Sequence, residues 1–262
     1  MKRSKEIVES RRSKVLQALR SNGLVKVQEL ADELQVSPLT IRRDLQYLED
    51  RKMLERFYGG ATYVNWTPEA STAQDEVQLC RQRIAEYAAT LVEDGDSIFI
   101  NTSSTALQVI RYIKDKKVTV ITNNGKAIYT EHSPMLTVVL SGGELREVKS
   151  AMVGDFAYNN INKVTAKKSF IGCTGLSPEC GMTTEILPEV SINQLMHERV
   201  AKCSYILADH TKFGKNSSFV SCATESITHV ITDEKAPLDI VTQFREKGIE
   251  VIMVKLNGQV ME

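Results

Sequence analysis

The segment from Ser37 to Leu45 constrains the fold of this chain more than any other part of it. Ser37 is suited to accept hydrogen bonds from the free N–H groups of a helix start, and Pro38 suits the first helical position. Ile41, Leu45 and Leu48 recur at i, i+4 and i+7, which predicts a helix with one buried face. The residues on or near its open face can form hydrogen bonds: Thr40, Arg42, Arg43, Gln46 and Tyr47.

An amphipathic segment precedes this predicted helix, and a basic hairpin follows it. The earlier segment places its apolar residues at helical spacing: Val27, Leu30, Ala31 and Leu34. Gln35 and Val36 form a short turn between the two segments. Two amphipathic helices joined by a tight turn are typical of a helix-turn-helix, and residues 56–61 are typical of the β-wing that often accompanies it. The pattern therefore predicts a DNA-binding module.

The candidate DNA contacts lie on the second helix and the wing: Ser37, Thr40, Arg42, Arg43, Arg56, Tyr58, Gly59 and Gly60. Arginine suits guanine O6/N7 or a phosphate, and glycine permits close backbone approach. Two alternatives stay open. Either helix arginine could pair with Asp44 or Glu49 and serve folding, and the glycines could simply form the turn of the wing. Because one helix specifies few base pairs, we expect a homo-oligomer, at least a dimer, on double-stranded operator DNA.

The charge balance is consistent with this prediction but would not carry it alone. The chain has no formal net charge, yet residues 1–60 carry 13 Lys and Arg against 9 Asp and Glu, whereas the remainder carries 20 against 24. No stretch has the length and apolarity of a membrane span or a signal-peptide core. The five cysteines form no Cys-x-x-Cys pair, and no histidine has a partner at metal-ligand spacing. We therefore expect a cytoplasmic protein with no metal site, no cofactor and no membrane partner.

The apolar pattern divides the chain into residues 1–63, the winged helix-turn-helix; residues 64–76, a polar linker; and residues 77–262, a larger domain. The larger domain has short apolar runs at residues 97–100, 118–122, 136–140, 169–172, 205–208, 229–232 and 251–254. Predicted helices lie between many of them, at 79–92, 104–114, 188–202 and 237–247. Apolar strands that alternate with helices predict an α/β fold, with a mainly parallel sheet and helices on both faces.

Small polar residues follow these predicted strands, where ligands bind in such sheets. The candidate effector-binding residues are Asn101, Thr102, Ser103, Ser104, Thr105, Thr122, Asn123, Gly142, Gly143, Thr174, Glu189, Asp209 and Lys212. Taken singly, such residues also cap helices and form turns. Their recurrence at successive strand ends favours one composite pocket. No G-x-G-x-x-G follows a strand and no P-loop motif occurs, so a dinucleotide is not predicted.

Residues 11–62 resemble the DNA-binding domain of the DeoR family of bacterial transcription regulators. The matching residues are Arg11-Arg12, Leu16, Gly23, Val25 to Val27, Glu29 to Ala31, Val36-Ser37, Thr40 to Leu45, Leu48-Glu49 and Arg56 to Ala61. The larger domain resembles, more loosely, the effector domain of the same family, whose fold is related to ribose-phosphate isomerases and coenzyme A transferases. Its matching stretches are Thr122-Asn123, Ser141 to Gly143, Ser150 to Gly154, Gly181 to Thr184, Glu189 and Asp209 to Gly214. The resemblance implies a small metabolite, commonly a phosphorylated sugar, that alters DNA affinity.

The larger domain departs from the family pattern at three places. Asn101 begins a loop that commonly reads Asp-Ser-Gly-Thr-Thr, and Thr174 stands where Gly-Ala-Asp-Gly has its acid. Asn193-Gln194 replaces a Lys-Arg pair. Hydroxyl and amide groups can still hydrogen-bond a polyol, so the effector could differ from the usual sugar phosphate.

The favoured function is a sequence-specific transcription regulator that represses a carbohydrate-utilisation operon and responds to a sugar or sugar-phosphate effector. Ligand-relieved repression is expected, and activation stays open. The alternative from another class is a sugar-phosphate isomerase or transferase with an appended DNA-binding domain. Proton transfer needs a positioned base, and only Glu189 and Asp209 remain for that role. We therefore expect no enzymatic activity.

Overall fold

The structure is a computed structural model that describes residues 2–22, 24–51, 53–57, 59–62, 68–146 and 149–261. The chain forms two compact units, Met1–Glu76 and Val77–Glu262. Each unit has a hydrophobic core of its own. Within the described ranges, no helix combines the length and the apolarity that crossing a bilayer requires.

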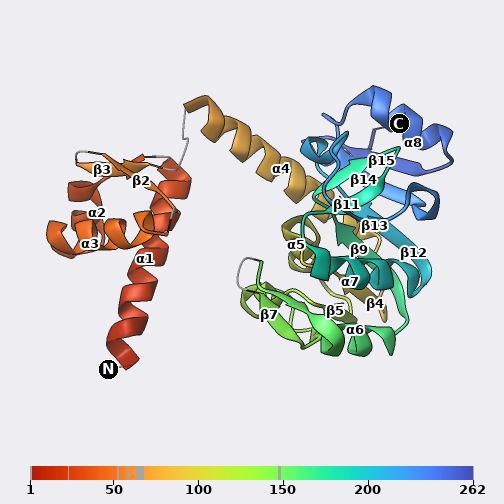
Figure 1. Cartoon of the computed structure of the whole chain (residues 1–262), viewed down its shortest axis with the longest axis horizontal. Helices are drawn as coiled ribbons and strands as arrows, with labels where there is room; N and C mark the ends of the chain where they lie inside the picture. Colours follow the sequence, from red (N-terminus) through yellow and green to blue (C-terminus); the bar gives the residue numbers. More distant parts are fainter. Residues whose placement is uncertain are drawn as a thin grey trace. The chain divides into compact units, whose positions relative to one another are not determined.

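The N-terminal unit is a winged helix-turn-helix, as predicted (Figure 1). Its helices are α1 (Lys2–Asn22), α2 (Val27–Glu33) and α3 (Pro38–Glu49). Its strands are β1 (Leu24–Lys26), β2 (Glu55–Phe57) and β3 (Gly60–Thr62), in the antiparallel order β1-β3-β2. The Ser37 hydroxyl accepts the Thr40 N–H at 3.2 Å, and Pro38 occupies the first turn, so α3 begins where the sequence predicts. Helix α1 was not among the predicted elements.

The core of this unit forms because α3 turns one apolar face inward. Ile41, Leu45 and Leu48 are buried there, against Val15 and Leu19 of α1. The predicted i, i+4, i+7 face of α3 is thus the buried one. Its opposite face keeps the exposed residues Arg42, Arg43 and Gln46.

The second unit is built on a seven-stranded sheet in which all neighbouring strands are parallel. Its strands are β4 (Ser97–Ile100), β5 (Val118–Thr122), β6 (Leu136–Leu140), β9 (Ala166–Gly172), β12 (Val200–Leu207), β14 (His229–Asp233) and β15 (Glu250–Val254). These are the seven apolar runs of the sequence, some of them a few residues longer than predicted. Their spatial order is β15-β14-β12-β9-β4-β5-β6, so the strand order reverses between β4 and β9.

Helices cover both faces of this sheet (Figure 1). One face packs against α4 (Pro68–Thr90) and α5 (Ser104–Tyr112). The other packs against α6 (Gly154–Asn162), α7 (Leu187–Glu198) and α8 (Leu238–Glu246). Because side chains alternate along a strand, Ile98 and Ile100 belong to the first core and Phe99 to the second. The predicted fold class, α/β with helices on both faces, is confirmed.

Several short antiparallel elements were absent from the prediction. β7 (Glu144–Arg146) and β8 (Ala151–Val153) form a hairpin, and β10 (Gly175–Ser177), β11 (Gly181–Thr184) and β13 (Phe219–Cys222) form a small sheet. Three 3-10 turns are also present: η1 (Gly125–Tyr129), η2 (His210–Lys212) and η3 (Thr224–Ser226). Strands of three or four residues are too short to produce a periodic signal.

Helix boundaries differ from the prediction by more than two residues at two places. Residues 68–76, expected to belong to a polar linker, form the first turns of α4. Proline at the first helical position, followed by Glu, Ala and Gln, is compatible with a helix even without an apolar period. Helix α7 ends at Glu198 instead of residue 202, because strand β12 begins at Val200, which pairs with Ala166 of β9.

Candidate DNA-binding face and effector pocket

Arg42 and Arg43 are exposed on α3 and form no ion pair with any residue that the structure describes. The Asp44 carboxylate, one of their predicted alternative partners, is buried and held by Arg11 at 2.5 Å and Arg12 at 2.9 Å. Both helix arginines therefore keep their charge and their N–H groups available at the surface.

The other two predicted contacts near α3, Ser37 and Thr40, already take part in local structure, as does Tyr47, which was expected only to lie near the open face. The Ser37 and Thr40 hydroxyls lie 2.9 Å apart in a mutual hydrogen bond at the helix start. The ring of Tyr47 lies between the guanidinium groups of Arg12 and Arg51, whose central carbons are 3.4 and 3.6 Å from its centroid. These contacts stabilise the helix end and fix the tyrosine ring.

The wing is attached to α3 through Arg56. Its backbone N–H donates to Glu49 Oε1 at 3.0 Å, and its guanidinium donates to Gln46 Oε1 and lies 3.7 Å from Glu49 Oε2. Glu49, the second alternative partner of the helix arginines, thus contacts the wing instead. Arg56 is a predicted DNA contact, and its side chain remains 32% exposed.

Both wing glycines are constrained by the backbone, Gly59 by the turn and Gly60 by the close approach of β3 to β1. Gly59 has a φ of +94°, and a Cβ atom on Gly60 would lie 2.2 Å from the carbonyl oxygen of Val25. The turn-forming role that the sequence left open is therefore present in the structure. Tyr58, the remaining predicted contact of the wing, lies outside the described residues.

A pocket of about 310 Å³ lies at the carboxyl ends of β4 and β9, where the strand order of the sheet reverses. Nine of the thirteen predicted effector residues line it: Asn101, Thr102, Ser103, Ser104, Thr105, Thr174, Glu189, Asp209 and Lys212. Residues that the sequence did not identify as candidates also line it: Arg81, Lys126, Lys149, Gly172, Cys173, Thr184, Glu185, Asn193 and Leu207. The expected convergence of several strand ends on one pocket is thus seen in the structure.

Asn101 is buried at the base of the pocket, and its amide is fully engaged within the protein. Its Nδ2 donates to Gly172 O at 2.8 Å and to Asn193 Oδ1 at 3.0 Å. Its Oδ1 accepts the N–H groups of Gly172 at 3.0 Å and Ser103 at 3.2 Å. This side chain therefore ties β4 to β9 and α7. Asn193 Nδ2 remains as a donor beside the pocket.

Glu189 is buried, and its carboxylate accepts hydrogen bonds from two threonine hydroxyls. Its Oε1 accepts from Thr102 Oγ1 at 2.8 Å, its Oε2 accepts from Thr184 Oγ1 at 3.2 Å, and Lys149 Nζ lies 3.4 Å from Oε2. The two threonine bonds join the end of β4 and strand β11 to α7 at the pocket wall.

Asp209 is also buried and engaged. Its Oδ2 accepts from Arg81 Nε at 2.7 Å, and its Oδ1 accepts from the Thr211 hydroxyl and from the Thr211 N–H at 3.0 Å. Burial raises the pKa of Asp209, but the hydrogen bonds from Thr211 and Arg81 outweigh it and hold this pKa below the ordinary value. The carboxylate is thus ionised at neutral pH.

The remaining charges give the pocket an excess of positive groups. Arg81 is paired with Asp209 and Lys149 with Glu189, whereas Lys126 and Lys212 form no ion pair among the described residues. Burial raises the pKa of the Cys173 thiol to about 12, so this pocket residue is a neutral thiol at physiological pH. No local signal reveals Arg81 or Lys126 in the sequence, because a basic residue on an amphipathic segment usually faces solvent.

Four predicted effector residues do not line this pocket: Thr122, Asn123, Gly142 and Gly143. Thr122 Oγ1 accepts the Asn124 N–H at 3.0 Å, and Asn123 Nδ2 donates to Met152 O at 3.2 Å, so both connect β5 to its surroundings. The two glycines have φ values of +68° and +110° in the turn after β6. Their residue types reflect turn geometry and strand connection in this structure.

Comparisons with known proteins agree with this two-part architecture. Residues 11–67 match the DeoR-like helix-turn-helix domain, and residues 78–234 match the DeoR C terminal sensor domain. The chain is 28% identical to a putative aga operon transcriptional repressor of Escherichia coli O157:H7, over 93% of each chain. It is 29% identical to the lactose phosphotransferase system repressor of Staphylococcus aureus, over 85% of this chain and 91% of the relative.

A solved structure of ribose 5-phosphate isomerase A from Methanocaldococcus jannaschii superposes with a TM-score of 0.36 and 15% identity, covering 51% of this chain and 53% of the isomerase. That likeness is too distant to carry an argument about function. The two domain matches, by contrast, account for most of the sequence. The chain belongs to the DeoR family of transcriptional regulators.

Proposed function

We propose that this regulator represses genes of carbohydrate use and that an anionic sugar derivative, bound in the sensor pocket, changes its affinity for DNA. The observation that carries the DNA part is the pair of exposed arginines, Arg42 and Arg43, on a capped helix. The relatives that the chain resembles include regulators named for the aga operon and for lactose uptake, which supports a carbohydrate operon as the target. A regulator of this kind acts where the DNA lies, in the cytoplasm.

Helix α3 would enter the major groove with Arg42 and Arg43 toward base edges and phosphates. Each guanidinium can form a bidentate pair with guanine O6/N7 or with a phosphate. Ser37 and Thr40 lie at the amino end of α3, where backbone and hydroxyl groups can contact phosphate. A single α3 helix reads few base pairs, so two copies of the chain on a two-fold symmetric operator are expected.

The pocket favours a small polyol that carries a phosphate or carboxylate. Four basic side chains and three acidic ones line the pocket, and among the described residues Lys126 and Lys212 form no ion pair. Asn193 Nδ2 and the hydroxyls of Ser104 and Thr174 can bind sugar hydroxyls. A volume of about 310 Å³ is at the lower end for small-molecule sites, which suits a monosaccharide derivative better than a dinucleotide.

Arg81 could couple effector binding in the pocket to the position of α4. It lies on α4, the helix that contains the boundary between the two compact units, and its guanidinium is held by Asp209 in the pocket. An anionic effector would attract Arg81 and compete with Asp209 for it. The effector can change DNA affinity only as far as it prefers one position of Arg81 and α4 over another.

The geometry does not favour the isomerase alternative. A general base needs a carboxylate that is free to accept a proton from substrate. Glu189 already accepts from Thr102 and Thr184, and Asp209 from Arg81 and Thr211. We therefore propose ligand binding without turnover.

The test is fluorescence-polarisation binding of the full chain to the DNA upstream of its own gene, with sugars, sugar acids and their phosphates as competitors. We expect tight binding that one anionic compound weakens. Arg42→Ala should weaken the preference for that DNA over random sequence. The matched control is Arg111→Ala, at an exposed arginine of α5, which should leave it intact. If neither this DNA nor other promoters are preferred over random sequence, the proposal fails.

A further inference from the structure

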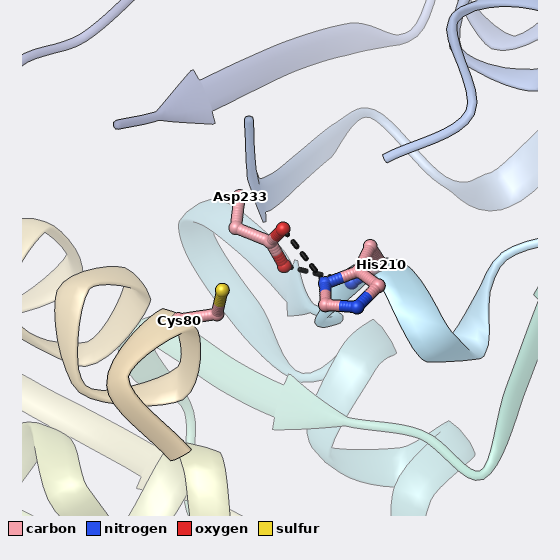
Figure 2. Close-up of side chains that lie close together, drawn as sticks. All are labelled: Cys80, His210 and Asp233. Atoms are coloured by element: carbon pink, nitrogen blue, oxygen red, sulfur yellow. Dashed lines mark hydrogen bonds and ion pairs between the residues drawn. The ribbon is translucent and has the colours of Figure 1, made fainter. Parts of the chain in front are cut away.

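Three potential metal ligands meet on the side of the sheet that α4 covers, although no spacing in the sequence connects them. Cys80 comes from α4, His210 from η2 after β12, and Asp233 is the last residue of β14. One ligand atom from each of the three lies within 4.8 Å of the other two. Figure 2 shows the thiol and the imidazole directed toward the Asp233 carboxylate.

We infer that Cys80, His210 and Asp233 form a binding site for a divalent transition metal, with zinc as the best-suited ion. Thiolate, imidazole and carboxylate together are a ligand set that Zn²⁺ accepts, whereas Mg²⁺ and Ca²⁺ prefer oxygen ligands alone. This site goes beyond the proposed function, because neither DNA binding nor effector binding requires it. The expectation from the sequence was that the chain has no metal site.

The carboxylate is prepared for this role by its backbone contacts. Asp233 Oδ2 accepts the His210 N–H at 2.7 Å, and Oδ1 accepts the Lys235 N–H at 3.0 Å. Such contacts orient a ligating carboxylate. The residue is fully buried, so its orientation is determined by these bonds and by the surrounding core.

The ligand separations suit a small cation after a modest adjustment. Zinc lies about 2.0–2.3 Å from its ligands and so holds them roughly 3–4 Å apart. His210 Nδ1 now lies 2.8 Å from Asp233 Oδ1, so the imidazole must move slightly away to admit the ion. The side chain of His210 is 22% exposed, which allows this movement and gives a solvent molecule access to a fourth coordination position.

The site borders the effector pocket, because two of its residues are next to pocket residues in the sequence. Cys80 precedes Arg81, and His210 follows Asp209; these two pocket residues form the ion pair between α4 and η2. A metal that joins Cys80 to His210 and Asp233 would fasten α4 to the carboxyl ends of β12 and β14. It would thereby hold Arg81 and Asp209 at a constant separation.

The experiment is a cobalt and zinc titration of the full-length chain after removal of metals with a chelator. We expect one Co²⁺ per chain, with the near-ultraviolet absorption of a thiolate–cobalt bond. Zn²⁺ should displace the cobalt and raise the thermal midpoint. Cys80→Ala should remove the absorption band and weaken Co²⁺ binding more than about a hundredfold, since even outer contacts of a metal site contribute tenfold to a hundredfold.

Matched controls separate this site from other thiols and imidazoles of the chain. Cys222→Ala changes a buried cysteine outside the cluster, and His132→Gln changes a partly exposed histidine outside it; both variants should bind Co²⁺ as the unsubstituted chain does. His210→Gln, on the partly exposed side, decides the question if Cys80→Ala fails to fold by circular dichroism. It should lose Co²⁺ affinity to a similar extent. No thiolate–cobalt band in the unsubstituted chain, or a band unchanged in the folded Cys80 or His210 variant, would overturn the inference.

Discussion

The DNA-binding face and the effector pocket use polar groups in opposite ways. Arg42 and Arg43 are exposed to solvent and form no ion pair with the described residues of their unit, whose buried carboxylate Asp44 is held by Arg11 and Arg12. In the pocket, Asn101 is buried, and its amide group joins separate strands and a helix. The two arginines of α3 can therefore be altered without cost to folding, whereas much of the pocket is part of the fold.

This difference suits the ligands proposed for the two sites. DNA is a large polyanion, so exposed cations gain affinity from charge and counterion release without being buried first. A small effector must instead find its partners already placed in a pocket, since it has few groups with which to offset the cost of ordering them. The contrast predicts that substitutions in the pocket mainly lower stability, whereas substitutions of the α3 arginines mainly lower DNA affinity.

The largest effect is expected at Asn101. Asn101→Ala leaves the buried N–H and C=O groups of Gly172 without their side-chain partner, which should lower the free energy of unfolding of the sensor unit by about 3 kcal/mol. Urea unfolding of the full chain, followed by circular dichroism, measures this loss. Ser104→Ala, at an exposed hydroxyl of the same pocket, should cost less than about 0.5 kcal/mol. Equal stabilities of the two variants would show that the pocket is not part of the fold.

The next effect concerns DNA affinity alone. Arg42→Ala and Arg43→Ala should each weaken operator binding by about 1–3 kcal/mol, roughly fivefold to 150-fold. The unfolding midpoint should not change, because neither arginine has a described ion pair. Polarisation titrations at several salt concentrations distinguish a phosphate contact, which lowers the salt dependence, from a base contact, which relaxes sequence preference. A loss of stability that accompanies the loss of affinity would contradict the contrast between the two sites.

Substitution of Arg56 is expected to lower both stability and DNA affinity, because this side chain contacts α3 and also remains partly exposed. Arg56→Ala removes its side-chain contacts with Gln46 and Glu49, and at 32% exposure these should contribute about 1 kcal/mol to the stability of the N-terminal unit. Operator affinity should also fall, by less than in Arg42→Ala. Arg56→Lys retains the charge but not the guanidinium geometry, so it should recover DNA affinity better than it recovers stability. A recovery in the reverse order would show that Arg56 acts on DNA through its fork of N–H groups.

The smallest effect is a pH dependence of the sensor unit that arises at His197. Its Nδ1 lies 2.7 Å from Ser204 Oγ, and its Nε2 lies 2.9 Å from Ser226 O. Burial lowers the pKa of His197 below the ordinary value of 6.5, although the bond to Ser226 and the charge of Glu198 oppose this shift. The unfolded chain therefore takes up a proton at higher pH than the folded chain does.

The stability that neutral His197 provides is complete above pH 6.5 and decreases as the pH falls from there through the lower folded-state pKa. Thermal midpoints measured between pH 8 and pH 5 should show this decrease in the unsubstituted chain. The decrease should be smaller in His197→Asn, which cannot be protonated in this range. An identical pH profile in both proteins would exclude His197 as the source.

Most of the fold was predictable because its signals are local. The seven strands of the parallel sheet are buried on both faces, so each appears in the sequence as an uninterrupted apolar run. Helix α3 was predictable from its cap, its proline and its apolar spacing. The β7–β8 hairpin and the β10-β11-β13 sheet were not, since strands this short depend on contacts with distant segments for their stability.

The pocket was predictable only in part. Residues that follow β4 and β9 were identified from their position after apolar strands, and they do line it. Thr122, Asn123, Gly142 and Gly143 satisfied the same criterion but lie outside the lining, because neighbouring strands and turns use them. Arg81 and Lys126 line the pocket without any sequence signal, since each belongs to an element whose register on the sheet is set by packing.

The sequence by itself determined the winged helix-turn-helix, the order of the parallel strands along the chain and the arginines on the open face of α3. These features depend on spacings within a dozen residues. Over that length, the geometry of a helix or strand fixes which side chains share a face. Only the tertiary structure decided that Asn101 is part of the framework, that Arg81 reaches Asp209 and that Cys80 meets His210 and Asp233. The reason is physical: those contacts join residues that lie far apart in the sequence, and only the packing of helices onto the sheet brings their side chains together.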